Sequence, residues 1–409
     1  MKTKISFFLL SALILYNSCN SDLQVDIDGK PAEPIVLTFK QTERVSADNR
    51  FSFEMFREIS TLNDTPNTFF SPLSLHFALG MLYNGASGET RTEMAEVLGM
   101  GDFTDTEINE YYQKMSQALL KIDPKTDIAI ANSIWIRNGF AVKQPFIDVN
   151  KKYFDAAVQS LDFNRPDAAG IINKWCSDKT KKRIPEIIKM IDGKMCLINA
   201  LYFKSKWRSD TKFDKADTKR GNFTKADLSA ISVNLMEQTN TFRYYADENL
   251  QCIELPYGNL AFGMVVILGE NSMSIDRLID CLDDATWQHI MDSMHGQKVW
   301  LKLPRFKIEC DMDLVKPVMN AGMQRIFEGG FANISDTELA VSVIKQKTFV
   351  EVNEEGTEAA AVTLTGMYGA IPNPNEPVQF FADRPFLYLI RERSTGTILF
   401  IGRMDEPNE

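Results

Sequence analysis

The sequence of 409 residues is poor in the residues that usually carry out catalysis. It contains only three histidines, His76, His289 and His295. The short patterns of a serine-hydrolase elbow, a zinc-protease helix, a phosphate-binding loop and a dithiol redox pair are all missing. The adjacent Glu354 and Glu355 do not form an acid pair, because neighbouring residues on a strand point to opposite faces. The sequence therefore predicts a protein that is not an enzyme and needs no cofactor.

Basic residues are also in deficit. The chain has 45 lysines and arginines against 55 acidic residues, a formal net charge of -10 at pH 7. This balance argues against binding to nucleic acid, and it offers no basic face to an anionic lipid surface. With 44% hydrophobic and 24% charged residues, the composition is that of a soluble globular protein with a sizeable core.

Only the N-terminus has an apolar run that suggests targeting, and this run is too short to cross a bilayer. Lys2 and Lys4 precede the apolar residues 5–15, and small and polar residues follow. This order is typical of an export signal. It predicts that the protein leaves the cytoplasm.

Cys19 directly follows Ser18, and this ending resembles a bacterial lipoprotein signal. The resemblance implies that residues 1–18 are removed as the signal peptide and that Cys19 is lipidated. The protein would then sit in the bacterial cell envelope, at the outer membrane or cell surface, held by its lipid anchor alone. Secretion is the alternative. Tyr16 and Asn17 depart from the pattern, because small or aliphatic residues are usual there.

The other cysteines indicate neither a disulfide framework nor a metal site. Five remain after Cys19, an odd number, and no two of them are closely spaced. They are Cys176, Cys196, Cys252, Cys281 and Cys310. We expect buried free thiols, while export to an oxidising compartment leaves one disulfide open as an alternative.

Residues 20–37, with Pro31, Pro34 and scattered aspartates, are typical of a flexible linker. We therefore assign residues 19–45 to a tether and residues 46–409 to a single domain. Helical patterns such as residues 48–59 and 275–291 occur mostly early in the chain, and strand patterns mostly late. This order, without strand–helix alternation, predicts an α+β fold.

The stretch from residue 350 to residue 377 has three parts. Val350 and Val352 alternate with polar residues as in a strand, residues 357–365 are small or β-branched, and the end is rich in glycine and proline. In an extended chain one face would carry only small, uncharged side chains. These are Thr357, Ala359, Ala361, Thr363 and Thr365. That face could be buried in a narrow space inside the protein without displacing core residues.

The octapeptide Glu-Glu-Gly-Thr-Glu-Ala-Ala-Ala at residues 354–361 resembles the reactive-loop hinge of serpins, the serine protease inhibitor superfamily. The resemblance extends over residues 46–407, and it includes residues 67–99, which are similar to the second and third serpin helices. It implies a serpin fold, with helices clustered around three β-sheets and an exposed reactive loop at about residues 356–379.

The resemblance also assigns functional roles to three groups of residues. Some of these residues have a purely structural interpretation as well, such as helix capping for Ser71 and Ser74 and core packing for Trp207. The hinge is Glu354, Gly356, Thr357, Glu358, Ala359, Ala360 and Ala361. The shutter, where the main sheet parts, is Ser71, Ser74, Asn199 and Gln346, with glutamine where the family commonly has histidine. The breach, where the loop first enters, is Trp207 and Arg305, and Arg305 is matched with Glu354 as an acid–base pair in place of the usual lysine.

Family spacing places the scissile bond at Ala370–Ile371. A small residue before the bond suits an elastase-like or subtilisin-like protease with a shallow primary pocket. Met367, Tyr368 and Gly369 are alternatives, and the first two would suit a chymotrypsin-like or cathepsin-like enzyme.

The resemblance implies a suicide-substrate inhibitor that acts as a monomer on a serine protease, with a cysteine protease as the alternative target. The protease forms an acyl-enzyme, and the cleaved loop then inserts into the main sheet. Residues 357–370 number fourteen and extend to roughly 46 Å, which exceeds the radius of gyration of about 21 Å for such a chain. The alternative functions are a non-inhibitory serpin-fold binding or structural protein and, more remotely, a hydrolase with an unrecognised serine.

Overall fold

The computed structural model describes residues 30–408, apart from residues 64, 271–272 and 358–375. Several predictions fall outside the described residues. They are the signal peptide, the lipidated Cys19, the hinge residues Glu358, Ala359, Ala360 and Ala361, and the reactive bond Ala370–Ile371 with its alternatives Met367, Tyr368 and Gly369.

Most helices precede most strands, so the predicted α+β order is confirmed. The α-helices in the described part of the chain are α1 (Phe39–Leu62), α2 (Pro72–Tyr83), α3 (Gly88–Val97), α4 (Asp105–Leu119), α5 (Gln144–Phe154), α6 (Ala168–Lys179), α7 (Ile275–Cys281), α8 (Asp284–Ser293) and α9 (Val315–Asn320). Helix α2 begins as its sequence predicts, because Ser71 Oγ accepts from the amide of Ser74 and Pro72 occupies the first turn.

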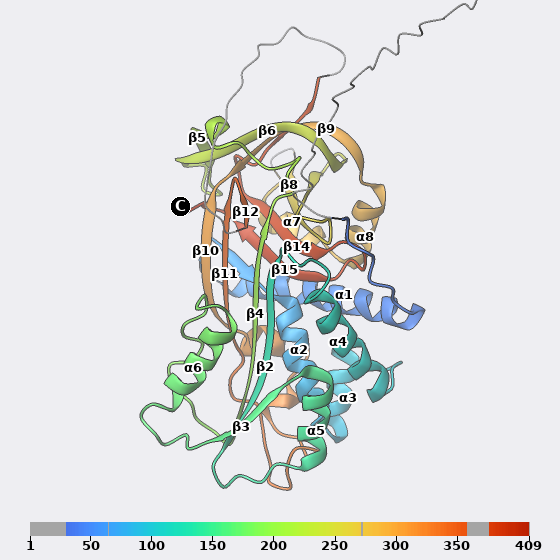
Figure 1. Ribbon diagram of the computed structural model, residues 1–409, viewed down its shortest axis with the longest axis vertical. Coiled ribbons are helices and arrows are strands. Elements are labelled where there is room, and N and C mark those ends of the chain that lie inside the picture. Colours follow the sequence, from blue (N-terminus) through green and yellow to red (C-terminus); the bar gives the residue numbers. More distant parts are fainter. Residues whose placement is uncertain (1–29, 64, 271–272, 358–375, 409) are drawn as a thin grey trace, which may run out of the picture.

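A six-stranded sheet runs along the long axis of the molecule (Figure 1). Its strands, in spatial order, are β10 (Phe306–Asp313), β11 (Lys345–Asn353), β12 (Gly356–Thr357), β4 (Met195–Lys206), β2 (Asp127–Arg137) and β3 (Ala157–Leu161). Helix α6 covers its outer face, where Ile172 and Cys176 belong to the same buried cluster as Ile198 and Ala200 of β4. Helix α2 lies against the inner face.

The remaining strands form a nine-stranded sheet, so strand pairing within the described residues gives two sheets where the resemblance implies three. They are β1 (Thr68–Phe70), β15 (Ile398–Met404), β14 (Phe386–Glu392), β8 (Phe262–Gly269), β7 (Leu250–Pro256), β6 (Ala230–Ala246), β9 (His295–Pro304), β13 (Val378–Phe381) and β5 (Lys219–Thr224). Strand β6 is 17 residues long and pairs with β7 at one end and with β9 and β5 along the rest. It therefore joins two groups of strands into one sheet.

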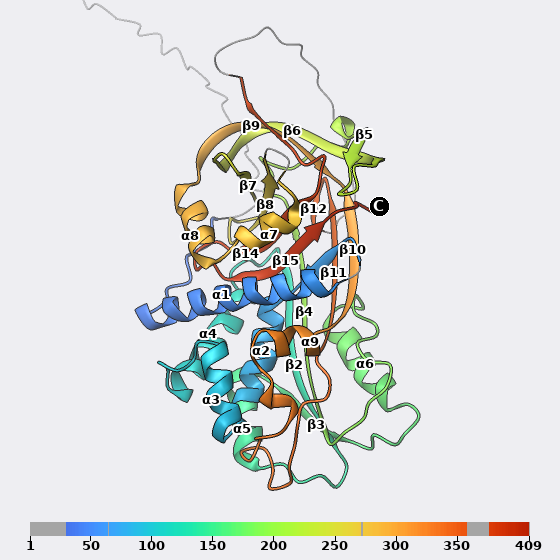
Figure 2. The same cartoon turned by 180° about the vertical axis from the view of Figure 1, so that it is seen from behind.

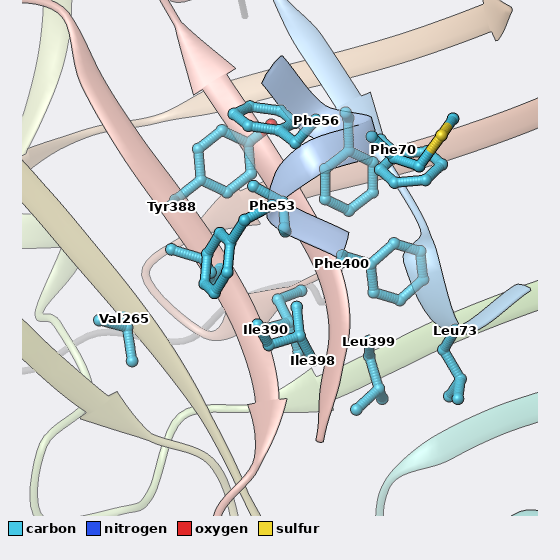
Figure 3. Packing of buried hydrophobic residues seen from close by; sticks show 14 of the residues in the cluster. Phe53, Phe56, Phe70, Leu73, Val265, Tyr388, Ile390, Ile398, Leu399 and Phe400 are labelled. Carbon is cyan, nitrogen blue, oxygen red and sulfur yellow. The ribbon is translucent and has the colours of Figure 1, made fainter. Parts of the chain in front are cut away.

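Helix α1 crosses the back of the nine-stranded sheet (Figure 2). Phe53 and Phe56 of α1 lie over Tyr388, Ile390 and the β15 side chains (Figure 3). All of these side chains are buried, as in a single continuous core.

The segment before α1 differs from the flexible linker that the sequence predicts. Residues 30–38, here called the strap, run extended against the body, and helix α1 begins seven residues before the expected boundary at residue 46. The reason is apolar anchoring, because Ala32, Ile35 and Leu37 all pack partly buried against the core. The linker prediction rests only on the proline and aspartate content, and it does not use the positions of these three apolar residues.

Three further features concern membrane spans, thiols and metal sites. Within the described residues, no helix combines the length and apolar character needed to cross a bilayer. The five cysteines after Cys19 are all free thiols, and three of them, Cys176, Cys252 and Cys310, are buried. In the same part of the chain no group of three or more histidine, cysteine or acidic side chains is arranged to hold a metal ion.

Candidate functional site

Strands β4 and β11 of the six-stranded sheet do not pair directly with each other among the described residues, and the space between them is here called the gap. Strands β4 and β11 are bridged only at one end, by the two residues of β12, in the part of the sheet that the structure describes. Thr357 lies between Val352 of β11 and Ser205 of β4 in antiparallel register with both. The first hinge residues therefore already occupy the place of a missing strand.

Gly356 can enter the gap because it is glycine. Its φ is 143°, a region that side chains other than glycine rarely adopt. A Cβ atom at this position would lie 2.3 Å from the carbonyl O of Ser205. Close backbone approach thus explains why the sequence needs glycine at the start of the hinge.

Thr357 is held by an aromatic cluster that closes the end of the gap. Its Oγ1 lies 2.6 Å from the hydroxyl of Tyr257, and its side chain is buried. The ring of Tyr257 stacks on Trp207 with centroids 4.6 Å apart. Trp207 Nε1 donates to the carbonyl O of Asn353 at 2.8 Å, and its amide donates to the carbonyl O of Glu355 at 2.9 Å. Trp207, predicted for the breach, therefore touches the hinge directly.

Glu354 and Arg305 pair as the sequence comparison implies. Arg305 Nε donates to Glu354 Oε1 at 2.7 Å, and the hydroxyl of Thr218 donates to the same oxygen. Burial alone would raise the pKa of Glu354, but the hydrogen bonds from Arg305 and Thr218 outweigh burial and lower the pKa. The carboxylate is therefore ionised at neutral pH and fixes the start of the hinge.

The four predicted shutter residues lie around the first turn of α2, in two separate groups. On the β11 side, Gln346 Oε1 accepts from the amide of Ser71 at 2.7 Å, and Gln346 Nε2 donates to the carbonyl O of Ser71 at 2.8 Å. The hydroxyl of Ser71 donates to the carbonyl O of Leu399 at 2.8 Å. This group ties β11 and β15 to α2.

On the β4 side, the hydroxyl of Ser74 donates to Asn199 Oδ1. Asn199 Nδ2 donates to Asn132 Oδ1 at 2.5 Å, and Asn132 Nδ2 donates to the carbonyl O of Phe154 at 2.7 Å. Among the described residues no hydrogen bond runs across the gap from Asn199 to Gln346. Strands β4 and β11 can therefore separate here without breaking a direct bond between them.

Below β12 the gap contains a cavity of about 140 Å³. Asn199, Gln346 and Leu197 line it from the two strands. Met190 and Val343 also line it and are 81% and 57% exposed. Exposed large apolar side chains beside a cavity are a feature of surfaces that bind another segment or partner.

The structure also contains a serine, a histidine and an aspartate in contact, away from the gap. Ser52 Oγ lies 3.3 Å from His76 Nε2, and His76 Nδ1 lies 3.2 Å from Asp48 Oδ1. All three side chains are at least 94% buried, and the hydroxyl of Ser52 donates to the carbonyl O of Asp48 at 2.6 Å. Substrate has no access to this grouping, so it provides no hydrolytic site.

Three contributing residues were missed from the sequence. Asn132 had a usable signal, because it is a polar side chain inside an apolar strand. Tyr257 and Thr218 had none, because their partners Thr357 and Glu354 are more than 90 residues away.

Family comparison agrees with this geometry. The family model described as "Serpin (serine protease inhibitor)" matches residues 46–407. The chain belongs to the serpins. Human neuroserpin is 33% identical to this serpin over 372 residues, which cover 87% of this chain and 90% of neuroserpin.

Two solved structures share the fold. The thermophilic serpin tengpin in its native state has a TM-score of 0.81 and 28% identity, covering 93% of this serpin and 98% of tengpin. Thyroxine-binding globulin in complex with thyroxine has a TM-score of 0.80 and 26% identity, covering 90% of this serpin and 100% of that chain. The predicted serpin fold is therefore confirmed. The family contains protease inhibitors, and it also contains a member whose structure holds a hormone.

Proposed function

We propose that this serpin is a suicide-substrate inhibitor of an elastase-like or subtilisin-like serine protease, with a cysteine protease as the alternative target. The observation that carries the proposal is the double pairing of Gly356 and Thr357 with β11 and β4. Strands β4 and β11 are otherwise not paired with each other in the described residues, and every second residue of the sequence from Thr357 to Thr365 is small and uncharged. A loop that continues this pairing would fill the gap.

The observed register fixes where each loop residue would arrive. Thr357 is opposite Val352 and Ser205, and each further loop residue moves one position back along both neighbouring strands. After six such steps Thr363 would lie between Gln346 and Asn199. Thr363 would then bring a hydroxyl to the point where the two shutter groups face each other, and a hydroxyl both donates and accepts.

Alternation then assigns the inward face of the inserted strand to Thr357, Ala359, Ala361, Thr363 and Thr365. The inward neighbours on β11, such as Gln346 and Thr348, are already buried. Small side chains fit there without displacing core residues, whereas large or charged ones would not.

The chemical step belongs to the protease. Its nucleophilic oxygen, or sulfur for a cysteine protease, attacks the carbonyl carbon of Ala370 and forms an ester or thioester. The peptide bond to Ile371 breaks, and the nitrogen of Ile371 leaves as a protonated amine. Insertion then separates the acyl-enzyme from water before hydrolysis. The serpin contributes conformational free energy and no turnover, so it is not an enzyme.

The proposed location follows from the N-terminus. Residues 1–18 direct export, Cys19 carries the lipid, and the domain from residue 46 to residue 409 acts as a monomer at the bacterial envelope. The membrane contacts only the anchor, and neither nucleic acid nor a cofactor takes part. Metabolic labelling with a radioactive fatty acid, compared between wild type and Cys19→Ala, tests this placement.

Mass spectrometry after mixing with pancreatic-type elastase or subtilisin tests the inhibitory step. We expect a covalent complex that survives denaturation and a released peptide that begins at Ile371. The protein cleaved in its loop should melt well above the intact protein, because it gains a strand. Cleavage without an adduct for every serine and cysteine protease tried, with no rise in melting temperature, would identify a non-inhibitory serpin-fold binding protein.

A further inference from the structure

The strap contacts a turn that also holds the hinge. The amide of Ala32 donates to the carbonyl O of Asn259 at 2.9 Å, and the amide of Ile35 donates to Ser394 Oγ at 2.9 Å. The strap precedes α1 and joins the body to the predicted anchor (Figure 1). The segment that leads to the anchor is therefore part of the folded body.

The turn between β7 and β8, residues 257–261, has a backbone that needs support. Leu260 has a φ of 74°, in the left-handed region that glycine adopts more easily because it has no Cβ atom. Asn259 Nδ2 donates to the carbonyl O of Ile122 at 3.0 Å, and Arg393 Nη1 donates to the carbonyl O of Leu260 at 3.4 Å. Such a conformation persists only where surrounding contacts fix it.

The same turn is attached to the gap in the sheet. Tyr257 contacts Thr357 through the 2.6 Å hydroxyl pair, and the amide of Gly258 donates to the carbonyl O of Lys206 at 3.0 Å. Lys206 is the last residue of β4 and pairs with Gly356. Two residues of the turn therefore touch the hinge and one edge of the gap, and the next residue touches the strap.

The strap has partly buried anchors rather than a close-packed core. Ala32, Ile35 and Leu37 are partly buried against the body, and Lys114 Nζ donates to the carbonyl O of Val36 at 2.5 Å. A cavity of about 200 Å³ is lined by Ala32 and Pro34 of the strap and by Leu260 and Arg393 of the body, among others. Release of the strap therefore exposes less apolar surface than opening the core would.

We propose that the strap braces the turn at residues 257–261 and thereby slows insertion of the hinge beyond Thr357. Insertion requires β4 to move away from β11, and the turn holds the end of β4 in place. A docked strap stabilises the turn in the position that limits further separation of β4 from β11. Release of the strap frees the turn, the Tyr257–Thr357 contact and the end of β4 together. The effect on insertion rests on the proposed inhibitory function, whereas the coupling from strap to hinge does not.

Hydrogen exchange of the purified protein tests the coupling without any protease. Ala32→Pro removes the amide that binds Asn259, and Ile35→Gly removes an apolar anchor of the strap. Both should speed exchange about fivefold in residues 204–208 and 353–357, the factor expected for loss of one ordinary hydrogen bond. Glu33→Ala is the matched control, because that side chain is 86% exposed in the same strap.

Faster exchange in the strap and in residues 257–261, with residues 353–357 unchanged in both variants, would overturn the proposal. A second measurement follows the spontaneous loss of covalent-complex formation during incubation below the melting temperature. We expect Ala32→Pro to lose this capacity about fivefold faster than Glu33→Ala. Equal rates alongside a coupled exchange effect would remove the link to insertion, whereas failure of every variant and of the wild type to form a complex would count against the proposed function alone.

Discussion

Gln346 binds both polar groups of the Ser71 backbone, accepting from its amide at 2.7 Å and donating to its carbonyl O at 2.8 Å. Both residues are buried, so water cannot replace either bond. Ser71 caps α2, and Ser74 in the first turn of the helix binds Asn199 on the other side of the gap. One helix start therefore connects both edges of the gap, and Gln346 is the only β11 side chain that the structure shows bonded to the backbone of Ser71.

Replacement of Gln346 by methionine should destabilise the intact protein. Methionine has a similar length, but it leaves the buried amide of Ser71 unsatisfied, and the carbonyl O of Ser71 keeps only its bond from the amide of Leu75 at 3.3 Å. We expect a loss of roughly 1–3 kcal/mol, the cost of one buried unsatisfied group. Urea unfolding measures it, and Glu351→Met on the part-exposed face of β11 is the control, expected to stay within about 0.5 kcal/mol of wild type. Equal effects at the two positions would contradict this role.

The resemblance of residues 354–361 to serpins predicts the hinge, and the structure describes this hinge only as far as Thr357. The need for glycine at residue 356 comes from close approach to the carbonyl O of Ser205, a contact distant in the sequence that no local pattern specifies. The start of α2 and the length of β4, in comparison, follow from local capping and apolar runs. By contrast, the residues expected to form one helix at 275–291 form α7 and α8, because Asp283 caps a new helix by accepting from the amide of Thr286.

Long-range partners explain what the sequence does not reveal. Tyr257 meets Thr357 across 100 residues, and the strap meets a turn more than 220 residues away. The strap contains Pro31 and Pro34, as a linker would, yet three of its apolar side chains pack on a surface that exists only in the folded protein. The nine-stranded sheet likewise depends on the pairing of β6 with β5, β7 and β9, which the composition of these strands does not specify.

Acid should weaken the Glu354–Arg305 pair. The pKa of Glu354 is lowered in the folded protein, so its contribution to stability is present above the unfolded value of 4.5 and disappears as pH falls through the folded pKa. Glu354→Gln should cost roughly 1–3 kcal/mol at pH 7 and progressively less below pH 4.5. Urea unfolding between pH 7 and pH 3 measures this, with the neighbouring Glu355→Gln as control. A cost that stays constant over the whole range would exclude the ion pair as its source.

His76 should make stability fall on mild acidification. Burial lowers its pKa, the nearby Asp48 carboxylate opposes this, Arg44 adds to the lowering, and the net pKa is below 6.5. The unfolded chain therefore binds a proton first, and stability is lost as pH drops below 6.5, by up to about 1.4 kcal/mol per pH unit. His76→Asn should remove this part of the slope between pH 7 and pH 5 in urea unfolding. A slope that persists in His76→Asn would exclude His76 as its source.

An arginine should reduce covalent-complex formation strongly at residue 357 and little at the adjacent residue 358. Thr357→Arg would bury a cation against Tyr257, where no carboxylate is within the observed contacts, and an unpaired buried charge costs several kcal/mol. We expect cleavage by the protease with the covalent fraction reduced more than tenfold. Glu358→Arg would reach the outer face of the inserted strand, because continuing the register of Thr357 by one step would bring residue 358 beside the part-exposed Glu351 and Lys204. Its covalent fraction should stay within about twofold of wild type. Denaturing electrophoresis measures both fractions, and equal losses in the two variants would show that side-chain alternation does not govern entry into the gap.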